Sequence, residues 1–311
     1  MSEISLHTSV LLEESLAGLI QHVGGLYVDG TFGRGGHSSA LLQALSAEGR
    51  LLATDKDLDA LGSPQARELL ADSRLELAHS SFAQLHDLLA ERGKLGQVDG
   101  ILLDLGVSSP QLDVAERGFS FMKDGPLDMR MDVSQGESAA QWLSHVEERE
   151  LTMVLRDYGE EKFARRIASE IVLQRDENPL QTTGQLARLI EGVVKKREPG
   201  KHPATRSFQA IRIKVNHELD DLEQLLADSA SILKPGGRLV VISFHSLEDR
   251  IVKRFMREQS RGVIVPRHLP MPLEQEKLNF KCIGKAIKAS RDEVTSNVRS
   301  RSAVLRIAEK L

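Results

Sequence analysis

A glycine-rich stretch near the N-terminus carries residue types suited to binding a small ligand. It covers residues 29–38 and reads Asp-Gly-Thr-Phe-Gly-Arg-Gly-Gly-His-Ser. The apolar pair Tyr27-Val28 precedes it and a helix-like run follows it, so a strand should end in a turn that opens a helix. Such a turn offers bare backbone and unpaired N–H groups. Asp55 ends the next apolar run, at the spacing of a second-strand carboxylate that holds ribose hydroxyls. The pattern predicts a nucleoside cofactor.

The glycine spacing separates two classes of nucleoside cofactor. A dinucleotide turn needs G-x-G-x-x-G, but here Gly33 and Gly35 are followed by Ser38 where the third glycine belongs. Asp29 at the strand tip would also repel a pyrophosphate. S-adenosylmethionine, which carries methionine instead, fits better. With Asp55 in place, we favour a cofactor site over glycines that serve only a tight turn.

Composition limits the remaining classes. The 311 residues are 41% apolar and 28% charged, which suits one large domain or two modest ones. No apolar run reaches the roughly 18 residues of a membrane helix, and Met1 to Thr8 is not a secretory signal. Cys282 is the single cysteine, and the histidines show no metal-ligand spacing. We expect a soluble, cytoplasmic protein without a bound metal.

The charge of the chain is unevenly distributed. The net charge is −4, yet Arg250 to Leu311 contains fifteen Lys and Arg against six Asp and Glu. This basic region is either a solvated surface or a surface for a phosphate-rich substrate.

Strand and helix patterns alternate through the first hundred residues. This rhythm predicts a doubly wound, mainly parallel, Rossmann-like sheet. Together with the cofactor pattern above, we expect the class I methyltransferase form of this sheet. The expected strands are Tyr27-Val28, 51–54, 75–79 and 98–105, and the expected helices include 60–70 and 82–92.

A different pattern interrupts this rhythm. Residues 111–136 are turn-prone and 137–196 read as helical, with capping boxes predicted at Ser144/Glu147 and Thr182/Gln185. The α/β pattern then resumes. It gives a helix from Ser207 to about Leu233, a strand at 238–243 and a last strand at 302–307. We therefore expect a discontinuous methyltransferase domain, 1–112 with 207–311, and an inserted helical substrate-recognition subdomain, 113–206.

Polar or aromatic residues follow the third and fourth strands as well. Phe82, after the third, would either stack on an adenine or belong to the core. The fourth strand ends at Asp104 and leads to a Ser108-Ser109-Pro110 turn. A carboxylate and backbone carbonyls could accept the hydrogens of an exocyclic amine and localise its lone pair for methyl transfer. Methylation at a pyrimidine ring carbon needs a nucleophile such as cysteine, and Cys282 lies far from this loop.

These residues, with several further segments, resemble one family. It is the bacterial 16S ribosomal RNA (cytosine-N4)-methyltransferases, known as the MraW or RsmH family, and the resemblance runs from His7 to the last strand. The segments that carry it are residues 29–38, 100–113, 117–121, 126–131, 202–206 and 243–250.

The resemblance implies a reaction and a set of site residues. The methyl group of S-adenosylmethionine would pass to N4 of a cytidine in the decoding region of 16S rRNA, within the small ribosomal subunit. Asp104, Ser108, Ser109 and Pro110 would position the acceptor. The implied cofactor contacts are Gly35, Gly36, His37, Asp55, Phe82, Asp104 and Gln111.

Other roles stay open at this level. His37 could instead hold its ring in solvent on the first helical turn. We hypothesise that Asp128, Arg130 and the segment 117–121 fold over the cofactor and form part of the cytidine pocket. Arg206, His245 and Arg250 would contact RNA phosphates, or their segments would cap helices through Thr205 and Ser246, with equal weight for each.

Two other functions compete with the leading one. A DNA or protein methyltransferase would more often show Asp/Asn-Pro-Pro-Tyr where this chain reads Asp104-Leu-Gly-Val. A ribosome-assembly factor could bind S-adenosylmethionine without turnover. The sequence leaves open whether the chain forms a homodimer and whether free rRNA or an assembled subunit is the substrate.

Overall fold

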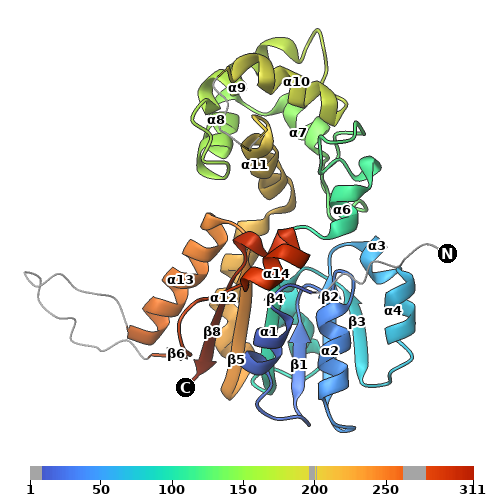
Figure 1. Ribbon diagram of the computed structural model, residues 1–311, viewed down its shortest axis with the longest axis vertical. Coiled ribbons are helices and arrows are strands. Elements are labelled where there is room, and N and C mark those ends of the chain that lie inside the picture. The colour runs from blue at the N-terminus through green and yellow to red at the C-terminus, as the bar shows by residue number, and fades with distance from the viewer. Residues whose placement is uncertain (1–8, 196–199, 201, 262–277) are drawn as a thin grey trace, which may run out of the picture. The chain divides into compact units, whose positions relative to one another are not determined.

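The computed structural model describes residues 9–195, 200, 202–261 and 278–311 (Figure 1). They divide into two compact units. The first contains the chain up to Gly106 and from Asp220 onward, and the second is Val107–Leu219. The sequence predicts 113–206 for the insertion, whereas the second unit also includes residues 107–112 and 207–219. The addition at its C-terminal end contains α11 (Thr205–Asn216), which packs with α7 (Ala139–His145) and α8 (Glu148–Asp157) of the same unit.

The first unit is built on a mainly parallel sheet, which confirms the predicted fold class. In the described residues the sheet has eight strands in the order β3-β2-β1-β4-β5-β8-β6, and β7 also pairs with β8. The pairs from β3 through β5 are parallel, whereas β8 is antiparallel to β5, β6 and β7. The strands are β1 (Leu26–Asp29), β2 (Arg50–Asp55), β3 (Leu75–His79), β4 (Val98–Asp104), β5 (Leu233–Ser243), β6 (Phe280–Cys282), β7 (Ile287–Lys288) and β8 (Val304–Lys310).

The strand order reverses between β1 and β4, because β2 and β3 lie on one side of β1 and β5 lies beyond β4. At such a switch point the connecting loops diverge to opposite faces, and ligands bind at the carboxyl ends of the strands. The predicted site residues of the first unit follow these ends.

Apolar layers cover both faces of the sheet, so the central strand β4 is apolar throughout. Ile101 and Leu103 pack in one cluster, and Leu102 between them packs in the other. The helices of this unit are α1 (Leu12–Leu19), α2 (Gly36–Ala44), α3 (Leu58–Leu61), α4 (Pro64–Leu69), α5 (Leu85–Glu91), α12 (Glu218–Ile232), α13 (Ser246–Arg261) and α14 (Arg291–Ser296).

The second unit is helical, as predicted for 137–196. Its apolar core includes Trp142, Leu155 and Ile167. Besides α7, α8 and α11, it contains α6 (Ser109–Asp113), α9 (Ala164–Gln174) and α10 (Thr183–Val193).

Three local predictions can be compared with the helix boundaries. The capping box at Thr182/Gln185 is confirmed. The box at Ser144/Glu147 is wrong, because Ser144 lies inside α7, and Ser138 forms the box there with Gln141. The single helix from Ser207 to Leu233 is also wrong, because His217 takes a left-handed conformation, φ 53°, that separates α11 from α12.

A buried carboxylate on β4 links three strands. Asp99 accepts a hydrogen bond from the Leu26 backbone N–H at 2.8 Å and forms an ion pair with Lys234 on β5. A carboxylate this buried is stable only when paired.

We predict that Asp99→Ala lowers the free energy of unfolding by about 2 kcal/mol, because it leaves the Leu26 N–H without its acceptor. Urea unfolding measures the change. Glu223→Ala, at an exposed position on α12, is the matched control. Equal stabilities of the two variants would contradict the prediction.

Candidate functional site

Three carboxylates follow the carboxyl ends of adjacent strands in the first unit. Asp29 ends β1, Asp55 ends β2 and Asp104 ends β4, and both neighbouring strands pair directly with β1. Burial raises the pKa of all three, to about 6 for Asp55 and Asp104. The negative charge of Asp29 also raises the pKa of the other two. This edge of the sheet therefore holds carboxyl groups whose ionisation a bound cation would favour.

Asp29 organises the glycine-rich turn. Its side chain is fully buried. Oδ2 accepts a hydrogen bond from the Ser38 hydroxyl at 2.6 Å, and Oδ1 accepts one from the Thr31 N–H at 3.0 Å. The carboxylate therefore ties the end of β1 to the first part of α2. Asp29 thereby shapes the turn.

The turn itself requires glycine where α2 begins. Gly35 is the N-cap of α2 and has φ 73°, in the left-handed region. A side chain there would also lie 2.7 Å from Leu69. At Gly36 a Cβ would overlap the Ser9 side chain. Both glycines therefore let the turn pack closely, and α2 begins with backbone N–H groups at this edge of the sheet.

Asp55 connects the second strand to the same turn. One carboxylate oxygen accepts a hydrogen bond from the Gly33 N–H at 2.7 Å and the other accepts one from the Asp57 N–H at 2.8 Å. Each carboxylate oxygen has a further lone pair, so Asp55 keeps the capacity to accept from ribose hydroxyls.

His37 and Asp104 face each other across the ends of α2 and β4. His37 Nδ1 lies 3.5 Å from Asp104 Oδ2, and Nε2 lies 3.2 Å from the Val10 carbonyl oxygen. Because a carbonyl only accepts, the proton belongs on Nε2. The ring is only 5% exposed, so the alternative that it lies in solvent is wrong.

Asp104 has a buried oxygen with unused hydrogen-bonding capacity. Its backbone N–H donates to the Thr31 hydroxyl at 2.7 Å, which fixes the end of β4 against the turn. Within the described part of the chain, Oδ1 is buried and has no hydrogen-bond partner. A buried acceptor of this kind is costly unless a ligand supplies a donor or a positive charge. The three carboxyl groups and this oxygen fit a cationic nucleoside cofactor such as S-adenosylmethionine.

Phe82 lies next to the tip of β1. It begins a short 3-10 turn capped by Ser81, packs at the edge of an apolar cluster and remains partly exposed. A Cβ on Gly30 would lie 3.0 Å from its Cβ. The inner part of Phe82 therefore belongs to the core, and the stacking role stays a prediction.

Polar contacts that we did not predict from the sequence hold the 3-10 turn at Phe82 and the glycine-rich turn. The Ser81 hydroxyl donates to Asp221 on α12 at 2.6 Å, and Lys56 forms an ion pair with the same carboxylate. Thr31 and Ser38 were also missed, although both lie inside the glycine-rich stretch. Asp221 gives no local signal, because its partners are more than a hundred residues away.

Neither Ser246 nor Thr205 caps a helix as expected. Glu248 accepts hydrogen bonds from the backbone N–H groups of Phe244 and His245, at 2.8 and 3.2 Å, and His245 Nε2 lies 3.0 Å from it. His245 and Glu248, not Ser246, thus satisfy the start of α13. Thr205 provides no cap either, because the N-cap of α11 is Ala204 without a side-chain bond.

The predicted acceptor-positioning loop belongs to the second unit. Ser108 is the N-cap of α6 and its N–H donates to the Gln111 side chain at 2.8 Å, so the two form a capping box. Ser109 and Pro110 form the first turn of α6, and Gln111 is buried. Their catalytic and cofactor roles stay predictions.

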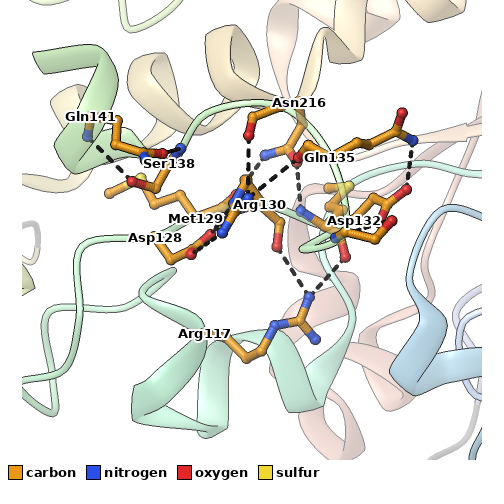
Figure 2. A network of polar contacts seen from close by, with 12 residues as sticks. Arg117, Asp128, Met129, Arg130, Asp132, Gln135, Ser138, Gln141 and Asn216 are labelled. Carbon is orange, nitrogen blue, oxygen red and sulfur yellow. Dashed lines mark hydrogen bonds and ion pairs between the residues drawn. The ribbon is translucent and has the colours of Figure 1, made fainter.

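Asp128 and Arg130 form a two-pronged ion pair in the second unit (Figure 2). Arg130 Nε and Nη2 donate to the two carboxylate oxygens at 2.9 and 2.8 Å. Burial opposes the ionisation of Asp128, but the hydrogen bonds and charge of Arg130 outweigh it and lower its pKa. The pair therefore holds its own loop rigid.

The same loop is fixed from two further sides. Asn216 accepts from the Met131 N–H at 2.6 Å and donates to the Met129 carbonyl at 2.7 Å, while Arg117 donates to the Arg130 and Met131 carbonyls (Figure 2). Met129 is buried with φ 62°, so these bonds hold an uncommon backbone conformation. Arg206 lies on α11 and is partly exposed.

Within the described ranges, no group of three or more His, Cys, Asp or Glu is placed to hold a metal ion. Over the same ranges, no helix combines the length and the apolar character needed to cross a membrane.

The amino-acid sequence is similar to those of known methyltransferases. The model of the MraW methylase family matches residues 4–311. A ribosomal RNA small subunit methyltransferase H from Pseudoalteromonas atlantica is 54% identical over 308 residues, which is 98% of each chain. Its counterpart from Shewanella oneidensis is 53% identical over 313 residues, which is 100% of this chain and 99% of that protein.

We predict that Asp104→Asn stabilises the ligand-free protein at pH 8 by roughly 2 kcal/mol. The folded protein raises the pKa of Asp104 from 3.8 to about 6, so the wild type loses stability as pH rises from about 4 to about 6. Asparagine does not titrate, and its advantage should therefore be absent at pH 4. Thermal unfolding at both pH values measures it, with the exposed Glu91→Gln as control. A variant less stable than wild type at pH 8 would contradict the prediction.

Proposed function

The chain belongs to the MraW methylase family, and from this we propose that it transfers a methyl group to the exocyclic N4 amine of a cytidine in the decoding region of 16S rRNA. It is a methyltransferase whose methyl donor is S-adenosylmethionine. The two relatives named ribosomal RNA small subunit methyltransferase H support a small-subunit rRNA substrate. The N4 position rests on the resemblance in residues 100–113 and the other segments, and on the acceptor chemistry of the loop after β4.

The proposal is carried by three desolvated carboxyls at the switch point, of which Asp29 is fully buried. When bound, S-adenosylmethionine supplies a methyl group on a positively charged sulfur. Asp55 would hold the ribose hydroxyls, and Phe82 would stack on the adenine. The remaining proposed contacts are Gly35, Gly36, His37, Asp104 and Gln111. A pyrophosphate would meet unfavourable charge at this edge.

Asp104 is proposed to act on the amine as well as on the cofactor. An exocyclic amine is a poor nucleophile because its lone pair is delocalised into the ring. An acceptor at Asp104 Oδ1 would hydrogen-bond the amine, localise that lone pair and take the proton the amine loses. The backbone carbonyls of Ser108, Ser109 and Pro110 would position the amine further.

The second unit is proposed to recognise the substrate. Asp128 and Arg130 would form a rigid wall of the cytidine pocket, since their loop is already held by Asn216 and Arg117. Arg206 and His245 would contact RNA phosphates. The protein would act in the cytoplasm.

We predict that the affinity for S-adenosylmethionine falls about tenfold between pH 7.5 and pH 5, because Asp55 and Asp104 become protonated through about pH 6. Titration calorimetry measures the affinity. Asp104→Asn should bind more weakly at pH 7.5 and show a smaller pH dependence. An affinity that is constant over this range would contradict the role of the carboxyls.

The transfer reaction is tested with S-adenosylmethionine labelled in its methyl group and small subunits from cells lacking this enzyme. We expect label in a single 16S rRNA cytidine, at N4, with Asp104→Asn reduced at least 100-fold. Mass spectrometry of nuclease digests locates the label. Label in DNA or protein would support a different acceptor, and cofactor binding without transfer would support an assembly factor. Either result would overturn the proposal.

A further inference from the structure

A stripe of positive charge runs along the outward face of α13 in the first unit. Five exposed cations share this face: Arg250, Lys253, Arg254, Arg257 and Arg261. At 100° per residue they fall within an arc of about 100°, and at 1.5 Å per residue they extend over about 16 Å. We propose that this stripe, the α13 stripe, binds successive phosphates of the rRNA backbone. The proposal rests on the proposed function, because it names the surface on which that substrate docks.

The opposite face of α13 fixes the direction of the stripe. Val252 and Met256 are buried in the apolar cluster that covers one side of the sheet. Phe255 packs edge-on against Phe280 of β6, with ring centroids 5.7 Å apart. The helix cannot rotate about its axis without exposing these side chains, so the cations are held outward.

The acidic residues of α13 do little to neutralise the stripe. Glu248 is buried and accepts backbone hydrogen bonds from Phe244 and His245. Asp249 is engaged by Arg306 of β8 through two bonds of 2.7 and 3.0 Å. Glu258 pairs with one cation of the stripe, Arg254, at 3.0 Å. The stripe therefore keeps a net positive charge, in a chain whose net charge is −4.

More cations lie on the strands beside this helix. Asn279, next to β6, donates to Gln259 of α13 at 2.9 Å, so β6 runs alongside the helix. Lys285, between β6 and β7, and Lys288, on β7, are exposed, whereas Lys281 on β6 pairs with Glu309 at 2.8 Å. The positive surface therefore continues beyond α13 along the edge of the sheet.

The composition of the stripe favours phosphate over other anionic partners. Four of the five cations are arginines, whose planar guanidinium groups match phosphate oxygens in pairs. A membrane-surface helix would need its apolar face free for lipid, but here that face is buried in the core.

The stripe also begins at the proposed reaction site. α13 follows directly from the carboxyl end of β5, next to β4 and Asp104. The negative charge of Glu248, in its first turn, contributes to the raised pKa of Asp104. A strand of RNA bound along α13 would therefore lead toward the carboxyl edge of the sheet.

The test is a charge-removing variant, Lys253→Gln with Arg257→Gln, neither of which we place in the catalytic or cofactor site. The matched control is Arg67→Gln with Lys94→Gln, two exposed cations on other surfaces of the same unit. Affinity for undermethylated small subunits is measured from 50 to 200 mM salt. Two lost phosphate contacts should lower the slope of log affinity against log salt by about 1.4 to 1.8, and weaken binding at 100 mM roughly tenfold or more.

Three further readouts make the result decisive. Cofactor affinity of the variant should equal that of wild type, which excludes misfolding. Lys253→Arg with Arg257→Lys, which keeps both charges, should restore binding. If wild type methylates the rRNA but the Gln variant has the same KM and salt slope as the control, the α13 stripe does not bind RNA and would serve another anionic partner. If wild type does not methylate rRNA at all, the proposed function itself fails.

Discussion

The site depends on three desolvated carboxyl groups where the strand order of the sheet reverses. Asp29, Asp55 and Asp104 lie at the ends of three adjacent strands, and burial raises the pKa of each. Such a cluster opposes its own ionisation, so it destabilises the ligand-free protein at neutral pH. The same property favours a cationic cofactor, because the cofactor offsets the cost that the fold has imposed.

The surrounding structure holds this unfavourable arrangement in place. Asp29 and Thr31 connect the ends of β1 and β4 to the glycine turn, and Asp55 connects β2 to it. Apolar clusters on both faces of the sheet stabilise the folded protein and offset the destabilisation that the ionised carboxyls cause. The second unit shows the same principle in its loop at 128–132, where two arginines and Asn216 hold a strained backbone.

The sequence predicted the local parts of this architecture well. Continuous apolar runs and the glycine turn were sufficient for the parallel sheet, and the placement of Asp29, Asp55 and Asp104 at strand ends followed from them. Contacts between distant segments gave no such signal. The bond between Ser81 and Asp221 and the burial of His37 against Val10 depend on packing. The break at His217 was missed because the helical pattern continues across it.

Asp104 is protonated more readily than an ordinary carboxyl until the cofactor binds. The direct measurement is a carbon-13 NMR titration of the aspartate carboxyls, with Asp104 assigned by its Asn variant. We predict a pKa near 6 for Asp104 without S-adenosylmethionine and a value below 4 when it is bound. A pKa near 4 in both states would contradict it.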